Sequence, residues 1–108
     1  MLARLCAACA LAAITACYPR SDGVAETIRI TVDNLAFVPA QVSAHVGDSI
    51  EWINNDFVAH TATDRKGAFN VMLPSHKVGT VTLKEAGSFD YYCRFHPTMT
   101  GHISVAGD

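Results

Sequence analysis

Polar and apolar residues alternate along several short stretches of the chain, the pattern of a β-strand that buries one of its faces. The stretches are residues 27–32, 41–46, 49–53, 78–83, 88–92 and 102–105. In the third of them, Ile50 and Trp52 share the apolar face. Because only Gly47 and Asp48 separate the second stretch from the third, we expect these two strands to be neighbours in a meander.

The spacing of these stretches indicates the fold class. They recur at intervals of roughly 8 to 12 residues with Gly, Pro and Asn at the joints, which is typical of a sandwich or barrel of antiparallel strands. No segment after residue 16 has the periodicity of an amphipathic helix. The sequence therefore predicts an all-β protein of about six or seven strands. A fold of this kind leaves the function open, so the function has to be sought in the loops.

Length and charge limit the domain organisation and the kinds of partner. The chain has 108 residues, of which 50% are hydrophobic, which is enough for one packed core but not for two. Its formal net charge is -2, and its eight Lys and Arg residues are scattered. Because a nucleic-acid-binding surface requires clustered positive charge, we exclude nucleic acid as the partner.

The first 16 residues have the features of an export signal. One positive charge, at Arg4, precedes an apolar run over residues 5–16. The run is shorter than the roughly 20 residues that a membrane-spanning helix needs. We therefore expect residues 1–16 to be removed on export to the periplasm, residues 17–25 to form a flexible leader, and residues 26–108 to form the folded domain.

Two outcomes of this processing stay open at Cys17. The residues that end in it, Ile-Thr-Ala-Cys, resemble the bacterial lipobox, in which the cysteine is lipidated and becomes the new N-terminus. Ordinary cleavage after Ala16 would instead release a soluble protein. In both cases the two cysteines of the signal leave with it. Cys93 then remains as an unpaired thiol of the folded domain, which in an oxidising compartment needs protection such as a bound metal.

The chemistry of the chain is concentrated in the segment from Cys93 to Met99. A thiolate, an imidazole and a thioether recur there at every third position, as Cys93, His96 and Met99. A tight turn between two strands can bring residues at this spacing to one side, so that they converge on a single ion. Pro97 fixes its own φ and removes an N–H that would need a partner. A second imidazole, His60, follows the strand that ends near residue 55, and we expect it in a loop beside this segment.

This donor set selects copper. Thiolate and thioether favour Cu(I), imidazole serves Cu(II), and trigonal coordination by two His and one Cys with a long axial Met is typical of blue-copper electron-transfer sites. Zinc is disfavoured because a thioether binds it poorly. Four protein donors leave no open position for a substrate, so we do not expect an enzyme. Taken alone, His60 is typical of a surface histidine, and only its combination with the segment that follows Tyr92 favours a metal site.

These motifs together resemble the plastocyanin and amicyanin cupredoxins. The resemblance covers about residues 26–106 and rests on residues 47–55 (Gly-Asp-Ser-Ile-Glu-Trp-Ile-Asn-Asn), His60, residues 85–87 (Glu-Ala-Gly) and the pattern Tyr92-Cys93-x-x-His96-Pro97-x-Met99. The short spacing from His96 to Met99 is similar to the ligand loop of amicyanin. The resemblance implies a Greek-key antiparallel β-sandwich or barrel with one type 1 copper, bound by His60, Cys93, His96 and Met99. It also implies a monomer that carries single electrons between redox partner proteins.

Two departures limit what the resemblance transfers. Thr61 follows the first ligand histidine where those cupredoxins usually have Asn, so we expect its hydroxyl and backbone N–H to substitute for the amide. The stretch from residue 60 to 72 is shorter than in amicyanin, so an amine dehydrogenase is not implied as partner. By resemblance, the edge of the His96 ring faces partners within an apolar surface. Candidates for that surface are Phe95, Pro97, Met72, Leu73 and Pro74, although Met72 and Leu73 fit the core equally well.

A copper carrier that delivers the metal to an exported oxidase is the alternative function. Delivery proteins tend to have open sites rich in Met or His, and this chain has only three Met. The remaining histidines are expected at the surface, His45 and His102 on the outward faces of their strands and His76 in a polar turn. Whether His76 binds a second copper stays open, because the resemblance places its loop toward the copper end.

Overall fold

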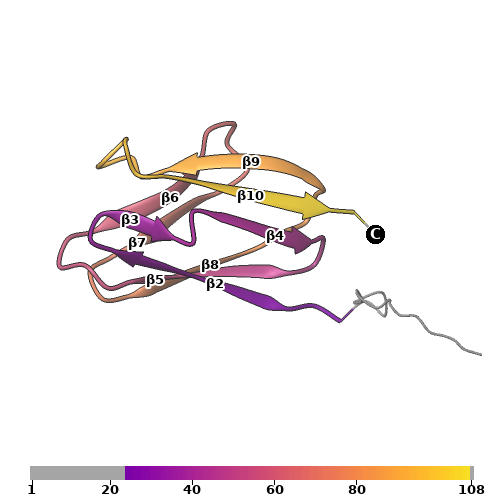
Figure 1. Ribbon diagram of the computed structural model, residues 1–108, viewed down its shortest axis with the longest axis horizontal. Coiled ribbons are helices and arrows are strands. Elements are labelled where there is room, and N and C mark those ends of the chain that lie inside the picture. Colours follow the sequence, from indigo (N-terminus) through magenta and orange to yellow (C-terminus); the bar gives the residue numbers. More distant parts are fainter. Residues whose placement is uncertain (1–23, 108) are drawn as a thin grey trace, which may run out of the picture.

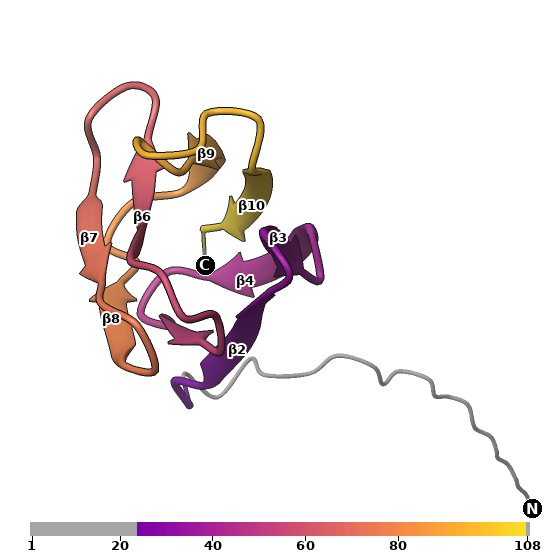
Figure 2. The same cartoon turned by 90° about the vertical axis from the view of Figure 1, so that its left-hand side faces the viewer.

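Two β-sheets face each other in the computed structural model, which describes residues 24–107 (Figures 1 and 2). The strands are β2 (Thr27–Asp33), β3 (Ala36–Val38), β4 (Gln41–His45), β5 (Ser49–Asn54), β6 (His60–Asp64), β7 (Asn70–Leu73), β8 (Val78–Thr82), β9 (Gly87–Tyr92) and β10 (Thr100–Ala106). One sheet has the order β4-β10-β9-β6-β7 and the other the order β3-β2-β5-β8. The predicted all-β sandwich is confirmed.

The predicted strands all appear, but the sequence pattern missed β3, β6 and β7. Strand β3 has only 3 residues, too few to show an alternation. Strand β6 (His-Thr-Ala-Thr-Asp) contains no large apolar residue, yet four of its five positions are buried. Its burial comes from the elements packed around it, which a local pattern does not contain.

The expected meander of β4 and β5 is wrong, because the two strands belong to different sheets. Strand β4 pairs with β10 and β5 pairs with β2, both in parallel, while the other pairs are antiparallel. The Gly47-Asp48 turn therefore crosses from one sheet to the other, and Gly47 has a φ of 100° that favours glycine. Alternation shows which face of a strand is buried, but it does not identify the neighbouring strand.

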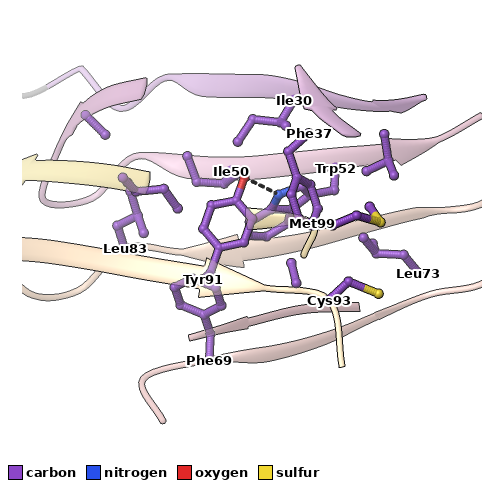
Figure 3. Packing of buried hydrophobic residues seen from close by; sticks show 14 of the residues in the cluster. Ile30, Phe37, Ile50, Trp52, Phe69, Leu73, Leu83, Tyr91, Cys93 and Met99 are labelled. Atoms are coloured by element: carbon purple, nitrogen blue, oxygen red, sulfur yellow. Dashed lines mark hydrogen bonds between the residues drawn. The ribbon is translucent and has the colours of Figure 1, made fainter. Parts of the chain in front are cut away.

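An aromatic cluster joins the two sheets in the core (Figure 3). Trp52 of β5 and Tyr91 of β9 are fully buried, and the Trp52 indole Nε1–H donates to the Tyr91 hydroxyl at 3.2 Å. The rings of Phe37 and Phe69 pack against Tyr91 with centroids 4.7 and 6.0 Å away. Burial raises the pKa of Tyr91 to about 12 despite this bond. The cluster therefore holds β9 in place at Tyr91, two residues before Cys93.

Gly101 of β10 is required by this cluster. A Cβ at Gly101 would lie 2.3 Å from the Tyr91 ring, so any larger residue would displace the tyrosine. The absence of a side chain lets β10 run directly beneath the ring. The strand that follows Met99 is thereby held at a fixed distance from the strand that precedes Cys93.

One end of the sandwich collects the candidate ligands. Strand β9 ends at Tyr92 and β10 begins at Thr100, which pairs with Tyr92, so residues 93–99 form a loop at that end. Strand β6 begins there at His60 and runs antiparallel to β9. Figure 1 shows the loop between β9 and β10 at the end of the molecule opposite the C-terminus.

The expected export signal, Cys17 and residues 17–23 of the expected leader lie outside the described residues. Within residues 24–107 the structure has no helix of the length and apolar character needed to cross a membrane.

Replacing Tyr91 by Phe should destabilise the fold. The change leaves the buried Trp52 N–H without an acceptor, so we expect the free energy of unfolding to fall by about 1–3 kcal/mol. Urea denaturation of the metal-free protein measures it. Tyr92→Phe is the matched control, because Tyr92 is half-buried and its hydroxyl forms no hydrogen bond within the described chain. Equal losses in the two variants would contradict the role given to the Trp52–Tyr91 bond.

Candidate metal centre

Three of the predicted ligand side chains converge at the end of the sandwich that carries the loop between β9 and β10. Donor atoms of His60, Cys93 and His96 all lie within 4.8 Å of one another, and the described residues contain no other such group. The Cys93 Sγ lies 3.7 Å from the His60 Nδ1 and 3.8 Å from the His96 Nδ1. His60 and Cys93 are fully buried, and His96 is half-buried.

These distances fit a metal ion held in a trigonal plane. An ion about 2.0 Å from a nitrogen and about 2.3 Å from a sulfur, in a trigonal arrangement, separates those two atoms by about 3.7 Å. Both nitrogen–sulfur distances of the group agree with that value. The side chains are therefore already placed to bind an ion without rearrangement.

His60 lies in a strand and not in the expected loop. It is the first residue of β6 and pairs with Leu73 of β7. No strand could be predicted here, because β6 lacks the alternation of large apolar residues that marks a strand in the sequence. Its pairing with β7 holds the His60 backbone more firmly than a loop would.

The loop that carries the other candidate donors closes on itself through its own backbone. The Cys93 N–H donates to the Met99 carbonyl, the His96 N–H to the Cys93 carbonyl, and the Met99 N–H to the His96 carbonyl, at 3.1, 3.3 and 2.9 Å. Met99 is 4% exposed and belongs to the same buried cluster as Cys93. Figure 3 shows the two sulfur-bearing side chains at one end of the core. This folding brings every third residue to the inner side of the loop.

Asp56 orients the His60 ring, a role that sequence reasoning missed. The Asp56 Oδ2 lies 2.8 Å from the His60 Nε2, and the same carboxylate accepts the backbone N–H groups of Asn34 and Leu35 at 2.7 and 3.0 Å. A carboxylate only accepts, so Nε2 carries the proton and Nδ1 keeps its lone pair toward Cys93. The only signal in the sequence was an aspartate four residues before the histidine.

The electrostatics of Asp56 follow from these bonds. Burial alone would raise its pKa, but the bonds from Leu35, His60 and Asn34 together outweigh burial and lower the pKa below the usual 3.8. Asn34 and Leu35 both have left-handed φ values, 53° and 62°. The carboxylate thus holds a strained turn between β2 and β3 against the metal centre.

Thr61 replaces the expected amide in two separate ways. Its backbone N–H points at the Cys93 Sγ, 3.4 Å away in a buried position. Its hydroxyl accepts the backbone N–H of Arg94 at 2.8 Å. The hydroxyl therefore fixes the ligand loop and the backbone N–H contacts the sulfur.

The apolar surface around His96 differs from the expected set. Met72 and Phe95 are 49% and 47% exposed, and Pro74 and Pro97 are exposed, but Leu73 is fully buried. Leu73 is excluded from the surface because β7 alternates and places Leu73 on its inner face.

Phe57 is an exposed aromatic residue that the sequence analysis did not single out. Its side chain is 88% exposed, and the ring packs edge-to-face on His76 with centroids 4.8 Å apart. No pattern marked Phe57, because an aromatic residue in a loop is usually buried.

The other histidines lie outside this candidate group of metal ligands. His76 is exposed, as expected. His45 and His102 are half-buried, and each lies near a carboxylate: His45 Nδ1 is 3.9 Å from Asp48 and His102 Nδ1 is 2.7 Å from Asp90. Within the described residues none of the three belongs to a group of three or more possible metal donors.

Comparison with known proteins agrees with this architecture. The family model of the cupredoxin-like domain matches residues 5–105, so the chain belongs to the cupredoxin-like family. Within it the chain is similar to amicyanins. It is 28% identical to amicyanin of Paracoccus versutus over 79% of this chain and 69% of that protein. It is 25% identical to amicyanin-alpha of Methylorubrum extorquens over 91% and 94%.

Solved structures of amicyanin variants superpose on the same fold. An oxidised methionine-to-leucine variant is 25% identical with a TM-score of 0.66, over 72% of this chain and 80% of that one. A Cu(I) form of a methionine-to-alanine variant is 25% identical with a TM-score of 0.65, over 73% and 81%. A reduced proline-to-phenylalanine variant is 28% identical with a TM-score of 0.64, over 78% and 83%.

Replacing Asp56 by Asn should weaken the metal-free protein. The neutral amide keeps one acceptor oxygen and has an NH2 donor in place of the other, so at least one of the three N–H groups that now bond the carboxylate loses its acceptor. We therefore expect the free energy of unfolding at neutral pH to fall by about 2 kcal/mol. Because the pKa of Asp56 is lowered, its contribution is present above about pH 3.8 and is lost as the pH falls further. The free energies of unfolding of the wild type and of Asp56→Asn should therefore become equal in acid.

Denaturant unfolding at several pH values measures this difference. Asp33→Asn is the control, since Asp33 is exposed at the end of β2 and forms no hydrogen bond through its side chain within residues 24–107. A loss in Asp33→Asn as large as in Asp56→Asn would contradict the account.

Proposed function

We propose that this protein is a small exported one-electron carrier in which His60, Cys93, His96 and Met99 bind a single copper ion. The convergence of two imidazoles and one thiol at distances that fit a trigonal ion is the observation that carries the proposal. A buried thioether, Met99, follows in the same loop. Soft sulfur donors together with imidazoles suit Cu(I) and Cu(II) alike. The amicyanin relatives support the same metal and the same role.

Copper supplies the one-electron couple when it is bound. The chain supplies a site that is the same before and after the electron passes: β6 fixes His60, Asp56 fixes the ring of His60, and the closed loop fixes His96. A rigid site lowers the reorganisation that accompanies each transfer. The Thr61 N–H directed at the sulfur stabilises negative charge there and so adjusts the potential. Four donors leave no position for a substrate, which favours a carrier over an enzyme.

Electrons reach the site through His96. Its ring is half-buried while His60 is fully buried, so His96 offers the shortest route to solvent. Exposed Phe95 and Pro97 flank it in sequence, and exposed Met72 adds apolar surface from the edge strand β7. A small apolar surface of this kind suits the weak, short-lived contacts of redox partner proteins.

We infer a periplasmic location for this monomer. The inference is supported by the export signal that the sequence predicts over residues 1–16 and by the likeness to amicyanins. Cleavage after Ala16 would give a diffusing protein, and lipidation of Cys17 a membrane-tethered one. Mass spectrometry of the exported protein separates the two forms.

The absorption spectrum of the copper-loaded domain tests the function. We expect residues 18–108 loaded with Cu(II) to show an intense visible thiolate-to-copper band, which bleaches with one electron per protein and returns on reoxidation. Cys93→Ser should abolish the band, because it removes the thiolate. His102→Ala is the control and should keep it. Copper bound without the band, or held only as Cu(I), would contradict electron transfer and favour delivery of copper to an exported oxidase.

A further inference from the structure

Arg94 is a charged residue in the ligand loop, and its side chain takes no part in the proposed metal binding. It follows Cys93 directly, and its side chain is exposed. It lies on the outer side of the loop, since it is exposed while Cys93 and Met99 of the same loop are buried. A guanidinium one residue from a ligand lies close to any partner that docks at His96.

A hydrogen-bond network holds Arg94 in one pose. Its backbone N–H donates to the Thr61 hydroxyl at 2.8 Å, and its side-chain Nε–H donates to the Asn70 Oδ1 at 3.2 Å. The hydroxyls of Thr61 and Thr63 are 2.9 Å apart, and the Thr63 hydroxyl lies 2.8 Å from the same Asn70 oxygen. Both the backbone and the side chain of Arg94 are thus attached to β6 and β7. An arginine fixed in this way loses little further entropy when it binds a ligand.

The two terminal nitrogens of the guanidinium remain available for an external partner. Arg94 forms no ion pair with any carboxylate in the described part of the chain, in contrast to Arg29, which pairs with Glu51 at 2.8 Å. The guanidinium carbon also lies 5.6 Å from the centroid of the Phe95 ring. Bonding through Nε leaves the Nη pair, which is the donor fork that binds a carboxylate through two bonds.

The surroundings of Arg94 indicate a protein as the partner. Phe95 and Met72, each about half-exposed, lie beside the residues that anchor it: Phe95 follows Arg94, and Met72 pairs with Thr61 across β6 and β7. An arginine combined with an exposed aromatic ring and a methionine is the composition that protein–protein interfaces favour. The formal net charge of the chain is -2, so a local positive group such as Arg94, and not the charge of the chain as a whole, would attract an acidic partner.

We propose that Arg94 binds a carboxylate of the redox partner, which therefore presents an acidic side chain beside the apolar surface that meets His96. This proposal rests on the electron-carrier function proposed above. It gives the partner a chemical signature and gives Arg94 a role in specificity that is separate from metal binding.

Mitochondrial cytochrome c provides a pair of matched probes. The native protein is basic, and succinylation converts its lysines into carboxylates around the same haem. Each transfer oxidises Cu(I) to Cu(II) and reduces the ferric haem to the ferrous haem. With the Cu(I)-loaded protein at low ionic strength, we expect stopped-flow rates to be higher with the succinylated form.

Arg94→Gln should lower the rate with succinylated cytochrome about fivefold to tenfold and should not lower the rate with the native form. Arg65→Gln is the matched control: Arg65 is also exposed, but its guanidinium stacks on Tyr92 of β9, 4.5 Å from the ring centroid, and not on a residue of the ligand loop. We expect less than a twofold change there. Equal losses in both variants, or a wild type that does not prefer the succinylated form, would overturn the proposal.

A second readout requires no copper. In the nitrogen-15 NMR spectrum of the metal-free protein, succinylated cytochrome should shift the amide signals of Arg94 and Phe95, and Arg94→Gln should remove the shift at Phe95. Signals that stay in place overturn the partner proposal even if the copper spectrum is as expected. A missing thiolate-to-copper band together with shifted amides would overturn the electron-carrier function and leave the acidic partner supported.

Discussion

The contact between Thr61 and Cys93 joins the two parts of the chain on which the metal centre depends. The Thr61 N–H points at the Cys93 sulfur, and the N–H of the next residue in the loop, Arg94, donates to the hydroxyl of the same threonine. These two bonds lock the start of β6 to the start of the ligand loop. His60 precedes Thr61 and His96 follows Arg94 by two residues, so the spacing of the two imidazoles depends on this junction.

Constraints from the rest of the fold converge on the same junction. The Trp52–Tyr91 bond holds β9 in the core two residues before Cys93, and Gly101 lets β10 pass close beneath Tyr91 after Met99. From the other side, Asp56 fixes the outer nitrogen of His60. A metal ion bound here would meet donors whose backbones and rings are held by contacts that do not involve the metal, which is the condition for small changes between oxidation states.

Much of this arrangement could be predicted from the sequence, because alternation marks buried strand faces and the Cys-x-x-His-x-x-Met spacing marks a soft metal site. The strands β2, β5 and β9, and the closeness of His60 to Cys93 and His96, agree with the structure. The pairing of β4 and the placement of His60 in β6 could not be predicted, since they depend on partners distant in sequence. Asp56 was missed for the same reason, as two of its three bonds are with Asn34 and Leu35. The burial of Leu73 could not be predicted, because an apolar residue at the end of a strand is buried only if its side chain lies on the inner face.

The central claim is that these side chains hold one copper ion in the same surroundings in both oxidation states. X-ray absorption at the copper edge, recorded on the Cu(II) and Cu(I) forms of one preparation, tests it most directly. The account predicts two nitrogen donors and one short sulfur donor in both forms, with only small changes in their distances. Loss of an imidazole or of the short sulfur distance on reduction would contradict it.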